Sequence, residues 1–177
     1  TFEPRYFHDA LALQETLDRD FADPRGGYFL SADAHDGLIV RPKESYDGAT
    51  PSSNSVAASN LLRLAAFTGD ERFAGRADRI FDAFGAILER AAPAFPRLLN
   101  ALDFRSSAPR EIVLAGEPGR EDFEALRRIV FASPDLNRVV AHVDPAASVP
   151  ELAPLTRARS TRDGKAAAYV CEKFACQ

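Results

Sequence analysis

The sequence predicts a mainly α-helical protein, with helical hairpins of an incomplete α/α barrel over residues 1–105 and a small α/β portion over residues 106–177. Two observations predict this class. Apolar residues recur at helical spacing through most of residues 4–104. After "RSSAP" the pattern changes to short, near-continuous apolar runs, which are typical of buried strands.

Residues 4–21 predict the first helix, which begins at Pro4 because the fixed φ of proline suits a first helical turn. One apolar face of this helix is expected to be buried, and it consists of Phe7, Ala10, Leu11, Leu17 and Phe21. "DPRGG" ends the helix, since proline cannot continue it and glycine permits positive φ. "YFLS" and "LIVR" then flank a turn at Asp36-Gly37, so they predict a short β-hairpin.

Three more helices are predicted over residues 52–67, 71–91 and 93–104. Between Val56 and Phe67 almost every residue is apolar, so the first of them is expected to be enclosed on most sides. Gly69 suits the C-terminal cap of this helix, and Asp70 suits the N-cap of the next. That next helix is amphipathic, and its apolar face consists of Phe73, Ala77, Ile80, Phe81, Phe84, Ile87 and Leu88. The shorter helix after it is expected to pack through Phe95, Leu98, Leu99 and Leu102.

An enclosed helix joined by two residues to an amphipathic one forms a hairpin with an inner and an outer member. Such hairpins, repeated round a ring, make an α/α barrel with a central cavity. Two hairpins cannot close a ring, so the enclosed helix should keep an apolar side that other structure must cover. The sequence therefore predicts that the rest of a longer polypeptide, or another copy of the chain, packs here.

The C-terminal portion predicts one strand–helix–strand unit. "REIVLAG" and "NRVVAHV" are the strands, and a helix over residues 120–131 lies between them. A strand that returns through a helix pairs in parallel, so Ile112–Leu114 is expected to lie parallel to Val139–Val143. "SVPELAPL" predicts a helical turn, and "KAAAYVCEKF" predicts a last strand.

Composition excludes several function classes. The net charge is -4 and the arginines are interspersed with acidic residues, so no basic face for nucleic acid is expected. No apolar run approaches the ~18 residues of a membrane span, and no signal peptide is recognisable. These features predict a cytoplasmic protein. The chain opens with Thr1 and contains no Met, which suggests a piece of a longer polypeptide.

No metal or cofactor is expected. His8, His35 and His142 are scattered, and no pair of them has the spacing of metal ligands. The glycine loop in "LAGEPGRED" lacks the features of a phosphate-binding loop, so an ordinary strand-to-helix connection is favoured. Cys171 and Cys176 are expected to be buried or free thiols, with a disulfide or a metal site as the less favoured alternatives, because pairing requires the chain to fold back.

The candidate functional site is the stretch "RPKESYDGATPSSNS", residues 41–55. Ser52 or Ser53 can cap the following helix, and Asp47-Gly48 can form a turn. The alternative is a site at the mouth of the barrel cavity, where Glu44 and Asp47 would supply the paired carboxylates that acid–base chemistry on a sugar uses. The ligand-binding residues of that site would be Arg41, Lys43, Tyr46, Ser52 and Asn54. Both alternatives are compatible with the sequence.

The stretch "GGYFLSADAHDGLIVRPKESYDGATPSSNSVAASNLLRLAAFTGD" closely resembles the thioredoxin-domain-containing family that includes spermatogenesis-associated protein 20 and bacterial YyaL. "AAAYVCEKFACQ" is similar to the C-terminus of that family. The resemblance implies a much longer protein, with a thioredoxin-like domain followed by an α/α toroid similar to N-acylglucosamine 2-epimerases and six-hairpin glycosidases. It also implies that Arg41, Lys43, Glu44, Asp47, Ser52 and Asn54 line the central cavity. Ser53 stands where glycine is frequent in the family.

Two function classes follow. In the first, the chain is part of a sugar-epimerase-like or glycosidase-like toroid that acts on or binds a carbohydrate-like ligand. In the second, it is a non-catalytic scaffold or interaction module that supports the thioredoxin-like domain. Aromatic and carboxylate side chains that share a cavity would favour the first class, and a cavity filled by side chains would favour the second.

Overall fold

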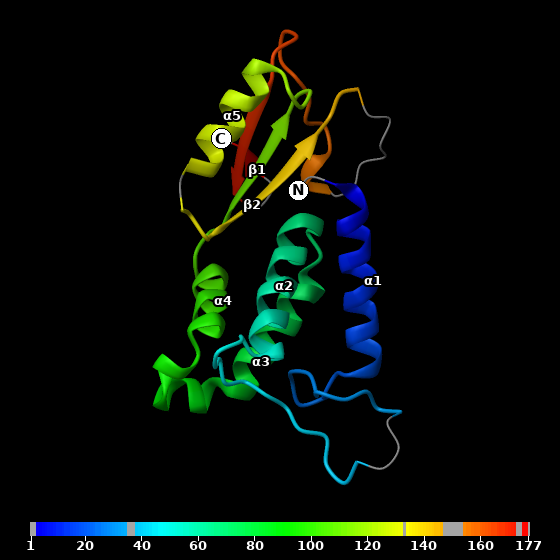
Figure 1. The fold of residues 1–177 in the computed structure, drawn as a ribbon, viewed down its shortest axis with the longest axis vertical. Coiled ribbons are helices and arrows are strands. Elements are labelled where there is room, and N and C mark those ends of the chain that lie inside the picture. The colour runs from blue at the N-terminus through cyan, green and yellow to red at the C-terminus, as the bar shows by residue number, and fades with distance from the viewer. Residues whose placement is uncertain (1–2, 35–37, 133, 147–153, 173–174, 177) are drawn as a thin grey trace. The chain divides into compact units, whose positions relative to one another are not determined.

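The computed structural model describes residues 3–34, 38–132, 134–146, 154–172 and 175–176. The chain is mainly α-helical (Figure 1). It divides into two compact units: a helical unit of residues 5–65 and 70–106, and an α/β unit built mainly from residues 107–177. The short segments 1–4 and 66–69 group with the α/β unit.

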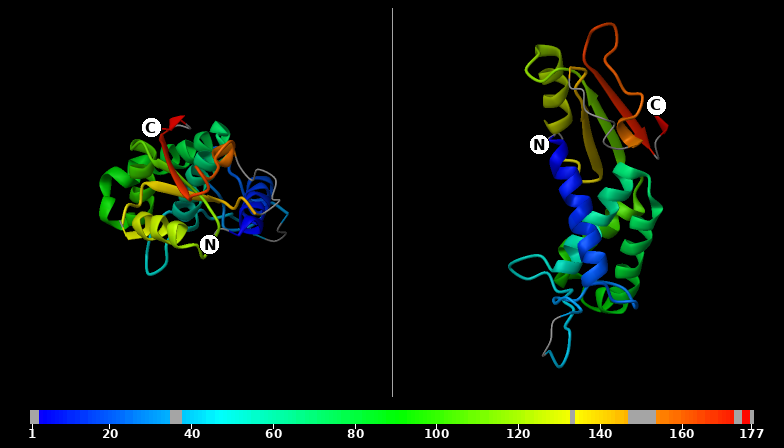
Figure 2. Two further views of the ribbon diagram at one scale, coloured as in Figure 1. Left: turned by 90° about the horizontal axis from the view of Figure 1, so that it is seen from above. Right: turned by 90° about the vertical axis from the view of Figure 1, so that its right-hand side faces the viewer.

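Four α-helices form the helical unit: α1 (Pro4–Asp20), α2 (Ser53–Thr68), α3 (Glu71–Arg90) and α4 (Pro96–Ser106). The helices lie side by side (Figures 1 and 2). Charged and aromatic side chains connect them. Arg76 on α3 pairs with Asp18 on α1, and Arg105 on α4 pairs with Asp78 on α3 at 2.8 Å. The Arg63 guanidinium of α2 lies 5.1 Å from the ring centre of Phe104 on α4.

The enclosure of α2 is largely confirmed. Eight of its sixteen residues are buried, and they are Asn54, Ser55, Ala57, Ala58, Ser59, Leu61, Leu62 and Leu64. Phe67 near the end of α2 is half-buried. Leu61, Leu62 and Leu64 are therefore already buried within this chain, although the sequence predicts that this helix keeps an apolar side for other structure to cover.

The predicted junction between α2 and α3 is confirmed. Gly69 adopts φ 69°, which glycine tolerates at a helix C-terminus. Asp70 is the N-cap of α3, and its side chain accepts a hydrogen bond from Arg72 N. The amphipathic prediction for α3 holds except at Ile87, which is exposed.

The prediction of a buried apolar face on α1 is wrong. Within α1 only Gln14 is buried. Ala10 is exposed, and Phe7, Leu11 and Leu17 are half-buried. The helical spacing of apolar residues correctly predicted the helix. The spacing alone does not determine whether another element packs on the apolar face and buries it.

The predicted β-hairpin is also wrong. The described parts of residues 22–47 contain no strand, and only an isolated bridge joins Ala22 to Tyr28. A backbone hydrogen bond runs from Leu30 N in the first predicted arm to Pro42 O, one residue beyond the second arm, at 2.9 Å. Ile39 and Val40 are exposed, so the second arm lacks the buried face that stabilises a strand in water. The predicted turn at Asp36-Gly37 lies outside the described residues.

The fourth predicted helix begins later than expected. A short 3₁₀ helix, η1 (Ala92–Ala94), contains Pro93, and α4 begins at Pro96. Each proline occupies a first helical turn, where its missing N–H costs no hydrogen bond, so the two prolines give two separate starts.

The α/β unit confirms the predicted strand pairing. The strands β1 (Arg110–Ala115) and β2 (Arg138–Val143) are parallel, with Ile112 opposite Val140. The helix α5 (Glu121–Ala132) connects them and packs on the sheet through Phe123, which lies in a cluster with Ile112 and Leu114. The predicted last strand is β3 (Ala167–Glu172), which is antiparallel to β1. With the short β4 (Ala175–Cys176), the sheet order is β2-β1-β3-β4.

The expectation of a free thiol at Cys171 is wrong, because Cys171 is disulfide-bonded. The chain folds back as pairing requires: β4 is antiparallel to β3, and Cys171 is opposite Cys176 in the register. The short 3₁₀ helix η2 (Pro154–Thr156) overlaps the predicted "SVPELAPL" turn at Pro154 and Leu155, and residues 148–153 of that turn lie outside the described residues. Within the described residues, no helix has the length and apolar character needed to cross a membrane.

Candidate functional site

The candidate segment 41–47 alternates between an inner and an outer face. Arg41, Lys43 and Ser45 are half-buried and Asp47 is buried, whereas the residues between them are exposed. This period of two is that of an extended chain lying on a surface. The inner side chains of Arg41, Lys43 and Asp47 bond to the protein, and the outer face consists of Pro42, Glu44 and Tyr46.

Asp47 joins the starts of two helices. Its Oδ1 accepts the Ser52 N–H at 2.8 Å, and its Oδ2 accepts the N–H groups of Arg97 and Leu98 at 2.8 and 3.2 Å. The first bond is at the entry to α2, and the other two are in the first turn of α4. A carboxylate here satisfies backbone donors that lack partners within a helix and complements the positive end of each helix dipole. Its own N–H donates to Ala94 O at 3.0 Å.

Ser52 caps α2. Its Oγ accepts the Ser55 N–H at 3.1 Å, and it lies 2.8 Å from Ser55 Oγ. Both serines are buried. The capping alternative predicted for Ser52 or Ser53 is thus realised by Ser52, because Ser53 is exposed.

Asn54 is fully buried, with 0% exposure, and connects three segments of the chain. Its Oδ1 accepts the Tyr28 N–H at 2.7 Å, while its Nδ2 donates to Tyr28 O at 3.0 Å and to Glu44 O at 2.7 Å. The side-chain amide therefore replaces a strand partner for Tyr28. It holds the segments around residues 28 and 44 against the first turn of α2.

Arg41 fixes the base of the loop before it. Its Nη2 donates to Ser31 O at 2.8 Å and to Asp20 O at 3.1 Å, and its Nη1 lies 2.9 Å from Asp33 Oδ1. The guanidinium also lies 4.2 Å from the ring centre of Phe29. These bonds occupy Arg41 within the protein.

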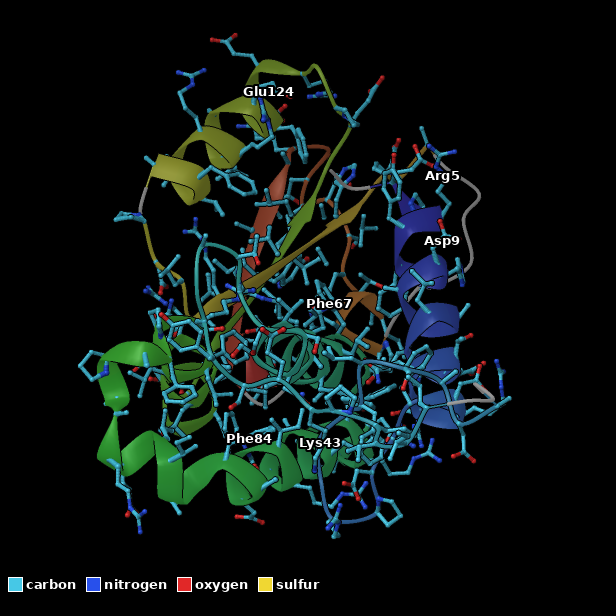
Figure 3. All side chains as sticks on the ribbon, turned by 60° about the horizontal axis from the view of Figure 1, so that its bottom comes forward. Arg5, Asp9, Lys43, Phe67, Phe84 and Glu124 are labelled. Atoms are coloured by element: carbon cyan, nitrogen blue, oxygen red, sulfur yellow. The ribbon has the colours of Figure 1, made fainter. Side chains whose placement is uncertain are left out.

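Lys43 pairs with Asp23, a residue that the sequence analysis did not identify. Lys43 Nζ lies 2.8 Å from Asp23 Oδ2 and donates to Gly26 O at 2.9 Å. Figure 3 shows Lys43 beside Phe84, whose ring centre is 5.9 Å from Nζ. The Asp23 carboxylate, only 2% exposed, also accepts the Arg25 N–H at 2.8 Å. The available signal was the aspartate that opens "DPRGG", a position where aspartate accepts backbone donors of its own turn.

The pKa of Asp23 lies well below its usual range, because Arg25 and then Lys43 hydrogen-bond to the ionised carboxylate. Folding therefore favours the charged form. The resulting contribution to the free energy of unfolding is present above the ordinary pKa of about 3.9 and is lost as the pH falls below it.

Asp23→Asn is expected to lower the free energy of unfolding by on the order of 1 kcal/mol at pH 7, and by less at pH 3. Urea denaturation of both proteins at the two pH values measures this. Lys43→Met should also reduce the pH-dependent contribution of Asp23 to the free energy of unfolding, because it removes one partner of the carboxylate. An Asp23→Asn effect of equal size at both pH values would contradict the assignment.

The structure does not bring Glu44 and Asp47 together as a carboxylate pair. Asp47 is buried on the inner face of the segment, and Glu44 is exposed on the outer face together with Tyr46. The structure instead groups the inner side chains with backbone groups of the protein, and it leaves Glu44 and Tyr46 as the candidate residues that face outward.

An open pocket of about 380 Å³ lies elsewhere in the helical unit, between α1 and the start of α3. Its lining is charged and balanced, with three carboxylates and three arginines among Glu15, Asp18, Arg19, Asp70, Arg72, Phe73 and Arg76. Asp70 pairs with Arg72 at 2.7 Å, and Asp18 accepts the Tyr28 hydroxyl at 2.7 Å. Burial, and then the bond to Asp18, raises the pKa of Tyr28 well above its usual range. Four of the six charged side chains of the pocket thus pair with each other, as Asp70–Arg72 and Asp18–Arg76.

Among the residues that the structure describes, no group of three or more histidine, cysteine, aspartate or glutamate side chains is arranged to hold a metal ion. At the glycine loop before α5, the first helical turn carries Glu121, Asp122 and Glu124. Their negative charge opposes the binding of an anion at this helix start.

Sequence comparison finds homologous proteins in animals. The chain is 35% identical over 178 residues to spermatogenesis-associated protein 20 of Homo sapiens, covering 98% of this chain and 23% of that protein. The Mus musculus protein is 33% identical over 178 residues, with coverage of 98% and 22%. Uncharacterized protein B0495.5 of Caenorhabditis elegans is 29% identical over 171 residues, with coverage of 97% and 23%.

The chain spans about a quarter of the length of these relatives. No profile of a protein family matches it. The alignments confirm the resemblance to spermatogenesis-associated protein 20. Over nearly its whole length, the chain is therefore homologous to about a quarter of spermatogenesis-associated protein 20.

Proposed function

We propose that this chain is a section of a longer protein related to spermatogenesis-associated protein 20, and that it acts as a non-catalytic scaffold within an α/α toroid. In this proposal, the segment 41–55 is a structural clamp that fixes the start of the inner helix α2. The rest of the polypeptide, including the thioredoxin-like domain that the resemblance implies, would be supported by this scaffold.

The observation that carries the proposal is the bonding of Asp47. Three backbone N–H groups from the starts of α2 and α4 occupy its two carboxylate oxygens. A general acid must present its proton to a substrate, whereas both oxygens of this carboxylate are occupied by backbone N–H groups of the protein. The side chain is also only 8% exposed as a residue, so its oxygens face the protein.

The toroid part of the proposal is supported by the contrast between α2 and α3. The helix α2 is buried on most sides, while α3 has a buried face and an exposed polar face. An inner and an outer helix in a barrel of hairpins would have these two patterns. The two-residue connection of Gly69 and Asp70 allows only an antiparallel hairpin between them.

A second candidate function is carbohydrate binding on the outer face of the clamp. Tyr46 is 59% exposed, and the exposed Glu44 lies two residues before it on the same face. An exposed aromatic ring beside a carboxylate offers a sugar both a stacking surface and a hydrogen-bond acceptor. Under this candidate, Asp47 keeps its structural role and only the outer residues bind the ligand.

The test compares Asp47→Asn with Glu44→Gln in the complete protein. Asp47→Asn replaces one of the two accepting carboxylate oxygens by an NH2 group, which cannot accept a hydrogen bond, so a loss of about 2 kcal/mol is expected. Glu44→Gln changes an exposed side chain and should stay within about 0.5 kcal/mol of the parent protein. Thermal denaturation followed by circular dichroism measures both effects.

Equal stability of the Asp47→Asn and parent proteins would refute the clamp. Titration with N-acetylglucosamine addresses the second candidate. Saturable binding that is lost in Tyr46→Ala and Glu44→Gln would favour the carbohydrate function over a purely structural one, and absence of binding in the parent protein would exclude this sugar as the ligand.

A further inference from the structure

Three consecutive apolar residues of the helical unit are exposed. Ile39 is 101% exposed, Val40 71% and Leu38 46%, and all three lie on an irregular segment between α1 and α2. Leu30, which lies on the other arm of the same loop, is 50% exposed. Single exposed apolar residues are ordinary, but a run of three branched side chains on a free surface is costly unless another structure covers it.

The base of this loop is held in place. The Arg41 bonds to Ser31 O and Asp20 O fix its second arm immediately after Val40. The backbone bond from Leu30 N to Pro42 O joins the two arms at the same level. The apolar side chains are therefore presented from an anchored base, which lowers the entropy lost when a partner binds them.

A second apolar surface of the same unit lies on α1. Tyr6, Ala10 and Leu13 are exposed and are spaced four and three residues apart, so they share one face of the helix. The two apolar surfaces belong to separate elements of the helical unit.

We infer that residues 38–40, the apolar loop, dock against another part of the longer polypeptide to which this chain corresponds. This inference rests on the proposed scaffold function and names the surface through which the scaffold contacts the rest of the protein. The alignments cover 98% of this chain but only 23% of the human relative, so about three quarters of that protein lies outside the aligned section. In the proposed longer protein, a partner of sufficient size would be connected to the same chain and present at high effective concentration.

The test places the photo-crosslinking residue p-benzoyl-phenylalanine at position 39 of the complete protein. After irradiation, mass spectrometry is expected to find crosslinks within one molecule to peptides outside residues 1–177. The same residue placed at Lys165, which is exposed in a polar turn of the α/β unit, serves as control. At least about tenfold fewer such crosslinks are expected from the control position.

Crosslinks between two molecules would overturn the inference in favour of a second copy. Crosslinks confined to residues 1–177, or a yield no higher than at the control position, would overturn it as well. These outcomes are independent of the Asp47→Asn experiment. The docking inference can therefore be refuted while the structural clamp is supported, and the clamp can be refuted while docking is supported.

Two substitutions test the same contact without a bulky probe. Ile39→Asp should raise the rate of limited proteolysis of the complete protein by about tenfold or more, because cleavage follows the population of the open form. Ile39→Leu keeps the apolar contact and should leave the rate nearly unchanged. An equal rate for both variants would contradict docking.

Discussion

Replacing Asn54 by alanine is expected to lower the free energy of unfolding by about 3 kcal/mol. The substitution removes three hydrogen bonds at a site with 0% exposure. Tyr28 N–H and Tyr28 O then lose their side-chain partner, and each unsatisfied buried group costs about 1–3 kcal/mol. The segment around residue 28 also loses its connection to α2.

Asn60→Ala is the matched control, because Asn60 lies on the same helix and is exposed. Its effect should stay within about 0.5 kcal/mol, with a slight gain from the helix propensity of alanine. Chemical denaturation of the two variants measures the difference. If Asn54→Ala were no less stable than Asn60→Ala, Asn54 would not have the connecting role that its hydrogen bonds indicate.

Gly26→Ala is expected to destabilise the helical unit by about 3 kcal/mol or more. A Cβ at this position would lie 2.3 Å from Arg79 O and 3.2 Å from Ala83 Cβ, so the turn would have to move away from α3. Gly26 also adopts φ +103°, which an L-residue rarely tolerates. Displacement of this turn would further weaken the bond from Lys43 Nζ to Gly26 O.

Gly119→Ala separates the cost of the close contact with α3 from the cost of the positive φ. Gly119 has a similar φ of +90°, but a Cβ there would meet no atom within 4 Å. Only the cost of the backbone conformation should remain, about 1–2 kcal/mol. Thermal denaturation of the two variants compares them. Equal losses would mean that the close approach of Gly26 to α3 contributes nothing to stability.

Local patterns in the sequence were sufficient for the elements whose formation depends on neighbouring residues. Gly69 and Asp70 end one helix and begin the next, because a cap needs only bonds within its own turn. The parallel pairing of β1 and β2 followed from the two apolar runs and the helix between them, since such a crossover leaves few other arrangements.

The sequence also contained a signal in the candidate site that could have been used. Glu44 and Asp47 are three residues apart, and in an extended segment an odd spacing places two side chains on opposite faces. The structure shows this arrangement as an alternation of exposure over residues 41–47. Spacing of three residues therefore argued against a carboxylate pair, unless the segment was helical. The direction of each face, inward or outward, could not be read from the pattern itself.

Tertiary structure alone decided which groups the site residues bind, because their partners are distant in the chain. Asp47 meets Arg97 N and Leu98 N fifty and fifty-one residues later, and Asn54 meets Tyr28 twenty-six residues earlier. Burial on α1 and pairing of the "LIVR" arm likewise depend on whether another surface covers them. A periodic sequence fixes which residues share a face, but the free energy of burying that face exists only when a second surface is there to exclude water from it.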